Sequence, residues 1–363
     1  MEGSHDPRRS TLRVFDLVET GGHESVHFGA DPETGYQSII AIHDTTLGPA
    51  LGGTRFYPYA SEEAALVDVL RLARGMTYKA ACAGLDQGGG KAVIIGDPAT
   101  VGNADLFRSH GRFVDSLGGT YITAEDVGTT VADMVIVREE TRHVAGLPIE
   151  HGGSGDPSPA TARGVIAAMT ATAEHIWGTD DLAGRRIAIK GVGKVGMSLA
   201  ERLHDRGAEL VVADVNQAAT DRAAAAFDAK VTSVDDIHAA DCDIFAPCAL
   251  GSDLSHDTIP QLSCAAVVGS ANNQLATPDD SIRLMEAGVV YAPDFVANAG
   301  GIINIAVARD GYSLPRAIEL VEHIRSTVAM ILKRADDLTI DTHRAAELIA
   351  EERIALARAK EHK

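Results

Sequence analysis

Residues 186–214 carry the pattern that most constrains the fold of this chain. An apolar segment, 186–190, is followed by the glycine turn 191–196, by a helical segment, 197–206, and by a second apolar segment that ends at Asp214. Strand, Gly-x-Gly-x-x-Gly turn, helix, strand and a terminal acidic residue, in this order, are typical of a dinucleotide-binding unit in a parallel sheet. Further short apolar segments extend the alternation, which predicts a Rossmann-type, doubly wound α/β domain.

The glycine turn also predicts which residues hold the cofactor. Gly191 permits the tight turn, Gly193 lets the backbone approach a pyrophosphate, and Gly196 lets the helix pack against the strand. Asp214 would accept hydrogen bonds from ribose hydroxyls and repel a phosphate group there, so NAD is favoured over NADP. The alternative is a glycine-rich turn that binds no ligand. The cofactor-binding residues predicted from this segment are Gly191, Gly193, Lys194, Val195, Gly196 and Asp214.

The length of the chain indicates more than one domain. At 363 residues it is long for a single hydrophobic core. Segment 146–159 is rich in Gly, Pro, Ser and Asp, which is typical of an interdomain hinge. Before it, strand-like and helix-like segments alternate, which predicts an N-terminal α/β domain with a mixed sheet. The predicted parts are an N-terminal domain at 1–148 with a loose tail at 1–12, the Rossmann-type domain at 149–339, and a C-terminal helix at 340–363 that returns toward the first domain.

The composition limits the partners of the chain. A formal net charge of −19 argues against nucleic acid or an anionic membrane surface, because both require a basic face. No apolar run reaches the roughly 20 residues that span a bilayer. The four cysteines have neither the paired spacing of a zinc site nor that of a disulfide framework, so a reduced, cytoplasmic location is expected. His23 and His27 match a zinc-protease spacing, but their surroundings favour a strand over the helix that this motif requires, and no metal site is predicted.

Four of the eight lysines lie in or beside glycine-rich turns, namely Lys79, Lys91, Lys190 and Lys194. Because arginine is three times as frequent in this chain, these lysines indicate positions where a compact, titratable ammonium group is required. A lysine near a second cation and an apolar wall loses its proton more easily, which makes it a general base. The alternatives are the charged end of an amphipathic helix for Lys79 and a surface lysine after a turn for Lys91. Together, these two lysines predict an active site.

Asp126 is the third candidate. It ends a predicted strand, 121–126, and precedes a predicted helix, 131–138. A carboxylate at this position commonly caps the following helix. In company with two lysines and a nicotinamide-binding domain, it becomes a candidate partner for a substrate ammonium group.

The motifs that contain these residues resemble those of the glutamate, leucine, phenylalanine and valine dehydrogenase family, and those of its leucine and valine branch most closely. The resemblance covers residues from about 45 to about 304. The matching segments are 48–55 (GPALGGTR), 76–79 (MTYK), 88–98 (GGGKAVIIGDP), 123–128 (TAEDVG), 153–159 (GSGDPSP), 246–251 (APCALG), 271–275 (ANNQL) and 298–301 (NAGG).

The resemblance implies a substrate-binding N-terminal domain that forms a homo-oligomer, an NAD-binding second domain, and catalysis between them. The implied reaction is the reversible oxidative deamination of an L-amino acid to its 2-oxo acid and ammonia. Lys79 would bind the substrate carboxylate together with the backbone of Gly52 and Gly53. Lys91 would be the general base, and Asp126 would bind the amino group. The resemblance adds Asn273 as a substrate contact, and its further cofactor contacts are Thr161, Ala249, Asn273 and Asn298.

Four apolar positions match those that line the substrate pocket in this family: Leu51, Ala124, Ile302 and Ile305. A glutamate side chain among them would carry an unpaired charge. The two isoleucines stand where valine is expected in a leucine-preferring relative, which narrows the pocket and favours a valine-like, branched-chain substrate. The alternatives are the same chemistry on an aromatic or unusual amino acid, and a catalytically silent NAD-binding homologue.

Two segments depart from the family pattern. Ala80 replaces an expected Asn, and 306–310 (AVARD) replaces the usual Ala-Asp-Glu-Leu. The second segment follows the pocket residues on the same predicted helix. It therefore bears on substrate identity and on the subunit interface, and not on the class of reaction.

Overall fold

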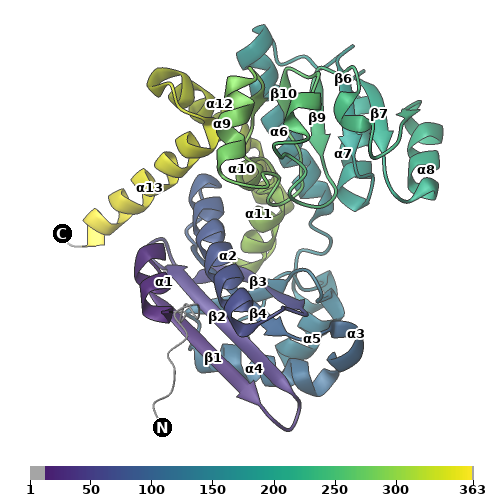
Figure 1. The fold of residues 1–363 in the computed structure, drawn as a ribbon. Helices are drawn as coiled ribbons and strands as arrows, with labels where there is room; N and C mark the ends of the chain where they lie inside the picture. Colours follow the sequence, from purple (N-terminus) through teal and green to yellow (C-terminus); the bar gives the residue numbers. More distant parts are fainter. Residues whose placement is uncertain (1–12, 362–363) are drawn as a thin grey trace, which may run out of the picture. The chain divides into compact units, whose positions relative to one another are not determined.

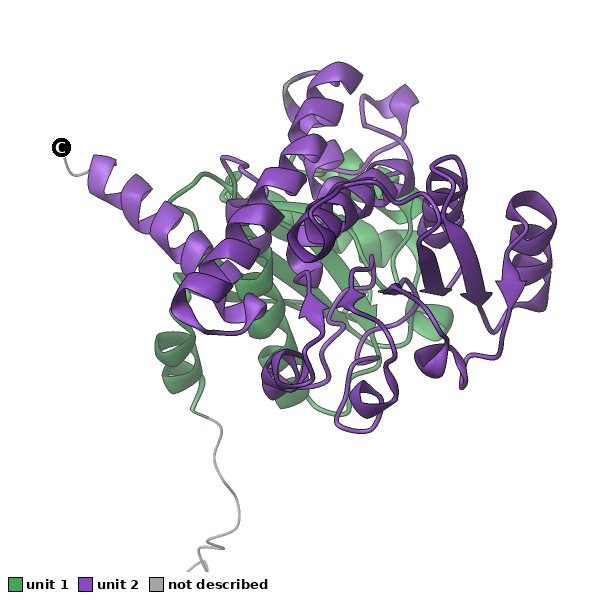
Figure 2. Ribbon diagram, turned by 90° about the horizontal axis from the view of Figure 1, so that it is seen from above, with its two compact units in different colours: residues 1–77, 87–144 green, residues 78–86, 145–363 purple. Residues whose placement is uncertain are grey.

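The computed structural model describes residues 13–361, and these divide into two compact units, which Figure 2 colours separately. The described residues of the first unit are 13–77 and 87–144, and those of the second are 78–86 and 145–361. Helix α2 (Glu62–Cys82) begins in the first unit, and its last residues belong by their contacts to the second. Each unit has a sheet and a hydrophobic core of its own.

The first unit contains a mixed sheet with the strand order β1-β2-β4-β3-β5 among the described residues, of which Figure 1 labels β1 to β4. β1 and β2 pair antiparallel, as do β2 and β4, whereas β3 pairs parallel with both β4 and β5. The mixed sheet predicted for the N-terminal domain is confirmed. The strands are β1 (Ser25–Asp31), β2 (Tyr36–Asp44), β3 (Ala50–Tyr57), β4 (Gly88–Ile95) and β5 (Tyr121–Glu125).

Alternating apolar side chains along β2 contribute to a cluster of buried residues on each face of the sheet. Ile39 packs in a cluster with Leu66 and Val69 of α2, whereas Ile40 packs in a second cluster with Val114 of α4. Successive strand side chains point to opposite faces, so one apolar strand serves a helix on each face. Full burial of such a side chain contributes roughly 1.5–3 kcal/mol. Besides α2, the helices here are α1 (Val14–Gly21), α3 (Pro98–Val101), α4 (Ala104–Ser116) and α5 (Val131–Glu140).

The second unit contains a parallel sheet with the order β11-β10-β9-β6-β7-β8 among the described residues. Taken in chain order, this is 3-2-1-4-5-6 read from β8, the arrangement of a Rossmann fold, and the predicted doubly wound domain is confirmed. The strand order reverses between β6 and β9, where ligands bind in such sheets. The strands are β6 (Arg186–Lys190), β7 (Glu209–Ala213), β8 (Lys230–Val231), β9 (Ile244–Pro247), β10 (Ala266–Val267) and β11 (Val290–Tyr291).

Helices flank this sheet, and the long helix α6 packs against α7, α11 and α12. The apolar core beneath them includes Phe245 and Tyr291, which are almost completely buried. The helices are α6 (Ser158–Trp177), α7 (Lys194–His204), α8 (Gln217–Phe227), α9 (Asp279–Glu286), α10 (Asp294–Ala297), α11 (Gly300–Val307), α12 (Leu314–Leu338) and α13 (Thr342–Glu361), with 3-10 turns at Ile149–His151, Ile237–Ala239, Ile259–Gln261 and Ala308–Asp310.

The last helix, α13, binds segment 78–86 within the second unit. The Tyr78 hydroxyl donates to Glu351 Oε1 at 3.2 Å. Arg353 donates to the carbonyl oxygen of Ala81 at 2.9 Å and to Asp86 Oδ1 at 3.0 Å. These bonds attach the end of α2 to the C-terminal helix. None of the helices in the described range is long and apolar enough to cross a membrane.

Candidate active site

Lys91 and Asp126, which the sequence places 35 positions apart, form an ion pair in the first unit. β4 carries Lys91, Asp126 directly follows β5, and β3 lies between these strands in the sheet. Lys91 Nζ lies 2.8 Å from Asp126 Oδ2, and the two side chains are only 7% and 18% exposed. The fold thus brings together the predicted base and the predicted partner of the substrate amino group.

Asp126 is held in its ionised form. Burial by itself would raise the pKa of the Asp126 carboxyl, but the charges of Lys91 and Arg55 outweigh burial and hold the pKa below its ordinary value. Thr129 Oγ1 accepts a hydrogen bond from the Asp126 backbone N–H at 2.9 Å, which fixes the chain at the end of β5. A fixed carboxylate in a half-buried site is suited to binding a cation.

Arg55 is a member of this site to which the sequence assigned no role. Its Nε donates to Asp126 Oδ2 at 3.1 Å, the same oxygen that Lys91 contacts. Its Nη1 donates to Asp68 Oδ2 at 3.0 Å. The position of Arg55 depends on β3 lying between β4 and β5, and no local signal predicts a strand in this segment, which contains two adjacent glycines and follows Pro49.

The backbone at Gly52 and Gly53 is packed too closely for any side chain. A Cβ at Gly52 would lie 1.8 Å from the carbonyl oxygen of Gly90, and one at Gly53 would lie 2.8 Å from Cβ of Asp126. Of the two predicted substrate-binding glycines, Gly53 therefore places bare backbone directly beside Asp126, and Gly52 places it against Gly90. The predicted pocket residues of this unit, Leu51 and Ala124, are buried.

Lys79 lies near the end of α2 and belongs to the second unit, whereas Lys91 and Asp126 belong to the first. Its Nζ donates to Asn272 Oδ1 at 3.1 Å, and Asn298 Nδ2 donates to the same oxygen at 2.9 Å. Asn298 Oδ1 is buried without a hydrogen-bond partner among the described residues. The sequence predicts Asn273 and Asn298 as site residues, but it does not predict Asn272, because no local feature distinguishes two consecutive asparagines.

The dinucleotide turn has the geometry that its three glycines require. Gly191 has a left-handed φ of 99°, and a Cβ there would lie 2.7 Å from the backbone nitrogen of Ala249. A Cβ at Gly196 would lie 1.9 Å from the carbonyl oxygen of Gly191, whereas one at Gly193 would meet no atom within 4 Å. The first glycine packs against the segment that follows β9, the third lies in α7 and packs against the first, and the middle one faces open space.

The acidic residue after β7 is fixed beside this turn. Asp214 Oδ2 accepts a hydrogen bond from the backbone N–H of Val192, and Oδ1 accepts one from that of Asn216, both at 2.8 Å. Each carboxylate oxygen retains a further lone pair for a ligand hydroxyl. Helix α7 begins at Lys194, and the backbone N–H groups of its first turn supply positive potential beside the glycine turn. The residues present therefore fit a dinucleotide.

Thr161 and the two pocket isoleucines lie where α6 and α11 begin. Thr161 Oγ1 donates to the carbonyl oxygen of Pro157 at 3.1 Å, and a Cβ at Gly301 would lie 2.8 Å from that hydroxyl. Ile302 and Ile305 follow on α11 at a spacing of three, which places them on one helix face; the first is buried and the second half-buried.

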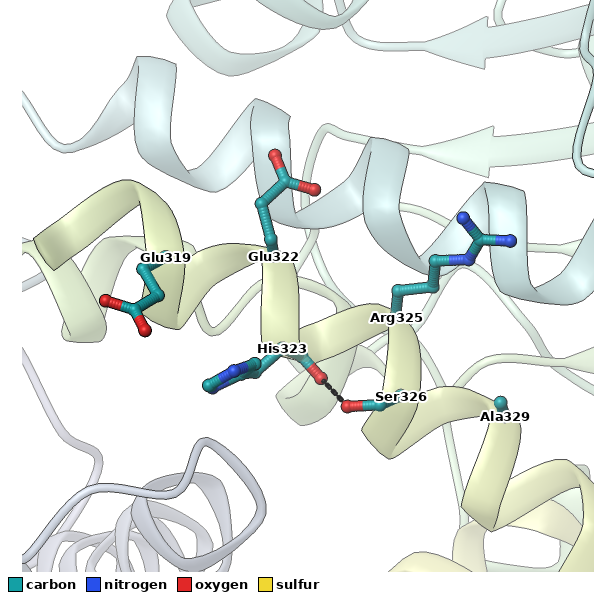
Figure 3. Close-up of a pocket in the computed structure, with 6 residues that line it drawn as sticks. All are labelled: Glu319, Glu322, His323, Arg325, Ser326 and Ala329. Atoms are coloured by element: carbon teal, nitrogen blue, oxygen red, sulfur yellow. Dashed lines mark hydrogen bonds between the residues drawn. The ribbon is translucent and has the colours of Figure 1, made fainter. Parts of the chain in front are cut away.

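A hollow on α12 is lined by none of these residues. Figure 3 shows that it is formed by successive turns of one helix, with the Ser326 hydroxyl donating to the His323 carbonyl oxygen at 2.8 Å. A concave surface that lacks every predicted site residue is not a candidate active site. Its lining residues are Glu319, Glu322, His323, Arg325, Ser326 and Ala329.

Comparison with known proteins agrees with this geometry. The model of the Glu/Leu/Phe/Val dehydrogenase dimerisation domain matches residues 23–143, and that of the Glutamate/Leucine/Phenylalanine/Valine dehydrogenase domain matches 152–223 and 212–360. The chain belongs to the Glu/Leu/Phe/Val dehydrogenase family. This family is NAD-dependent, and the chain is an amino acid dehydrogenase, an oxidoreductase that acts on a CH–NH2 group. Its substrates are accordingly an amino acid, or a 2-oxo acid and ammonia. The resemblance inferred from the sequence motifs is confirmed.

Individual relatives differ in the amino acid named. The chain is 51% identical over 347 residues to leucine dehydrogenase of Geobacillus stearothermophilus, covering 96% of this chain and 95% of that protein. It is 49% identical over 351 residues to valine dehydrogenase of Streptomyces virginiae, covering 96% and 98%. Among solved structures, L-tryptophan dehydrogenase from Nostoc punctiforme is similar with a TM-score of 0.85 and 42% identity, covering 95% of this chain and 99% of that one.

Proposed function

We propose that this protein catalyses the NAD-dependent, reversible oxidative deamination of a branched-chain, valine-like L-amino acid to its 2-oxo acid and ammonia. The observation that carries the proposal is the Lys91–Asp126 ion pair, at 2.8 Å, beside the bare backbone of Gly53. The Asp126 carboxylate complements the amino group that every L-amino acid presents, and Lys91 places an amine that can transfer protons directly beside it.

Different residues would bind the carboxylate and the amino group of the substrate. Lys79 and the backbone of Gly52 and Gly53 would bind the carboxylate, and Asp126 would accept hydrogen bonds from the amino group. Asn273 would help to orient the substrate. These contacts would fix the Cα–H bond while leaving the side chain to be read by the apolar pocket residues.

Lys91 would perform the proton transfers. The bound nicotinamide ring, when present, supplies the acceptor for the hydride that leaves Cα. The amino group would react in its neutral form, so that its lone pair forms the iminium as the hydride leaves. Lys91 would then take a proton from the water that adds to the iminium, give that proton to the nitrogen, and accept the hydroxyl proton as ammonia leaves. A neighbouring carboxylate 2.8 Å away holds Nζ in one orientation for these steps.

The cofactor would be held by the turn after β6 and by residues that follow the neighbouring strands. Asp214 would bind the adenosine ribose, and the N–H groups at the start of α7 would bind the pyrophosphate. The full set of proposed cofactor residues is Gly191, Gly193, Lys194, Val195, Gly196, Asp214, Thr161, Ala249, Asn273 and Asn298.

Four apolar side chains would select the substrate: Leu51, Ala124, Ile302 and Ile305. Two β-branched isoleucines narrow the pocket, which favours valine over leucine. The difference of one methylene is worth only about 1–3 kcal/mol. The likeness to an L-tryptophan dehydrogenase makes an aromatic amino acid the second candidate.

We also propose that the protein is a homo-oligomer assembled through the first unit, since the family model that matches it is described as a dimerisation domain. Light scattering coupled to gel filtration tests this, and a monomer mass of 38.0 kDa would contradict it.

The cysteines, three buried and one half-buried, are all free thiols, which supports the proposed cytoplasmic location.

A substrate panel tests the proposed function. The protein is mixed with NAD and L-valine, L-leucine, L-phenylalanine, L-tryptophan or L-glutamate, and formation of reduced nicotinamide is followed by absorbance. We expect the highest kcat/KM with L-valine and none with L-glutamate. Replacement of Ile302 by valine should raise the kcat/KM ratio of L-leucine to L-valine. The best rate with L-tryptophan would establish the aromatic alternative, and no reaction with any amino acid would establish a silent homologue.

A further inference from the structure

The guanidinium of Arg55 joins two carboxylates, of which only one belongs to the candidate active site. Nε donates to Asp126 Oδ2 at 3.1 Å, and Nη1 donates to Asp68 Oδ2 at 3.0 Å. The Arg55 and Asp126 side chains are each 18% exposed and that of Asp68 is 17% exposed. Three charged side chains in one half-buried cluster are costly to desolvate unless each is paired.

Asp68 is itself fixed by further donors. The Tyr59 hydroxyl donates to Asp68 Oδ2 at 2.7 Å, and Arg71 Nη2 donates to Asp68 Oδ1 at 2.9 Å. Arg55 lies in β3, and Asp68 and Arg71 lie in α2. A continuous line of charge-assisted hydrogen bonds therefore runs from α2 through Arg55 to Asp126, and such bonds are stronger than those between neutral groups.

The proposed chemistry assigns a role to this line of hydrogen bonds from α2 to Asp126. Lys91 and Arg55 contact the same oxygen of Asp126. When Lys91 acts as a base it is neutral for part of each cycle, and Asp126 then lacks one of its two positive partners. A guanidinium does not give up its proton, whereas the amine of a lysine that acts as a base is neutral during part of the reaction.

We propose that Arg55 is a positioning residue of the active site, which fixes the Asp126 carboxylate and keeps it anionic while Lys91 is neutral, and that Asp68 holds Arg55 in place. The inference rests on the proposed roles of Lys91 and Asp126. Arg55 itself touches neither the substrate amino group nor the reacting carbon; it acts through Asp126.

The proposal predicts a shift in the pH profile. The groups that face Asp126 are Lys91 from β4, Arg55 from β3 and the Tyr121 hydroxyl from β5, and those that face Arg55 are Asp68 and Tyr59. Without Arg55, the Asp126 carboxyl loses one of the two positive charges that offset its burial, so the pKa of Asp126 rises. Because Asp126 acts in its anionic form, activity is present above its pKa and is lost as pH falls through it. The acidic limb of kcat/KM therefore moves to higher pH.

The experiment compares Arg55→Gln, Arg55→Lys and Arg55→Ala in the full-length protein with its preferred amino acid and NAD. We expect Arg55→Gln to lower kcat/KM about 100-fold, as loss of precise orientation does, and to move the acidic limb upward. Arg55→Lys should restore part of the rate, and low concentrations of guanidinium should restore part of the activity of Arg55→Ala. Urea, which has a similar shape and no charge, should not.

Arg108→Gln is the matched control. Arg108 also donates through Nε and Nη1 to two acidic side chains, Glu139 and Asp105, on the surface of the same unit. Its loss should leave both the rate and the pH profile unchanged.

Asp126→Asn distinguishes a failure of the proposed function from a failure of the inference about Arg55. If Asp126→Asn retains activity, the proposed function of this site fails. If Asp126→Asn is inactive while Arg55→Gln keeps the wild-type rate and acidic limb, the inference about Arg55 is overturned. Loss of activity in Arg55→Gln with an unmoved acidic limb, and with no rescue by guanidinium, would also overturn it, because it would show a purely structural role.

Discussion

Asp126 and Lys91 form one ion pair, yet the two substitutions that break it should have unequal costs. Asp126 holds two cations, since Lys91 Nζ lies 2.8 Å and Arg55 Nε lies 3.1 Å from its Oδ2. Replacement by asparagine keeps the shape and removes the charge, and leaves an ammonium and a guanidinium without their shared counter-ion. Replacement of Lys91 by methionine leaves Asp126 still bound to Arg55.

The expected losses of unfolding free energy follow from the burial of the Asp126 and Lys91 side chains. Removing one partner from a buried ion pair costs about 3–5 kcal/mol, because the remaining charge stays desolvated. Since Asp126 is 18% exposed, we expect Asp126→Asn to lower the free energy of unfolding by about 3 kcal/mol, near the lower end of that range. Lys91→Met should cost about 1 kcal/mol, because an apolar side chain suits a site that is only 7% exposed.

Urea unfolding followed by far-ultraviolet circular dichroism measures both costs. The single tryptophan, Trp177, lies in α6 of the second unit, so its fluorescence provides an independent record of that unit. The reasoning is refuted if Asp126→Asn is as stable as the wild type, or if Lys91→Met is the more destabilised of the two.

Two further predictions concern the dinucleotide turn. Asp214→Ala should weaken NAD binding about tenfold or more, measured by titration calorimetry, because the ribose loses its acceptor and Val192 N–H its partner; an unchanged Kd would place the ribose elsewhere. Gly193→Ala should fold normally, because its Cβ meets no protein atom, but should bind NAD weakly, because the Cβ occupies the space where the pyrophosphate would approach. Gly196→Ala should lower the free energy of unfolding by about 1–3 kcal/mol, because its Cβ would lie 1.9 Å from the carbonyl oxygen of Gly191. Equal stability of the two alanine variants would contradict this account.

The Rossmann-type unit could be predicted from sequence because its signal is local. The turn at 191–196, the helix after it and Asp214 lie within one short segment, and each residue's role follows from a known backbone geometry. The structure places β6, α7 and β7 at these residues.

The first unit was harder to predict because its site depends on strand order. β3 contains two adjacent glycines and follows Pro49, so the segment reads as a loop. It becomes a strand because those glycines allow close packing, with Gly52 against Gly90 and Gly53 against Asp126. Without β3, the contact between Arg55 and Asp126 could not be foreseen, although the chemistry of Lys91 and Asp126 could.

The contact between Lys79 and Asn272 shows the same limit in the second unit. The glycine-rich surroundings single out Lys79, but 193 residues separate it from the amide that accepts its hydrogen bond. Periodicity and turn chemistry report on neighbours in sequence, and a pair so distant is set by tertiary packing alone.

The turnover of Lys91→Ala tests the central claim most directly, with Lys333→Ala as the matched control. Lys333 is a lysine on α12 that is 72% exposed and pairs with Asp337. Lys91→Ala should lose a factor of about 100 to 10,000 in kcat for amino acid deamination while binding NAD as the wild type does, and Lys333→Ala should keep full activity. Turnover of Lys91→Ala at the wild-type rate would contradict the account, because the buried ammonium beside Asp126 would then have no part in the reaction.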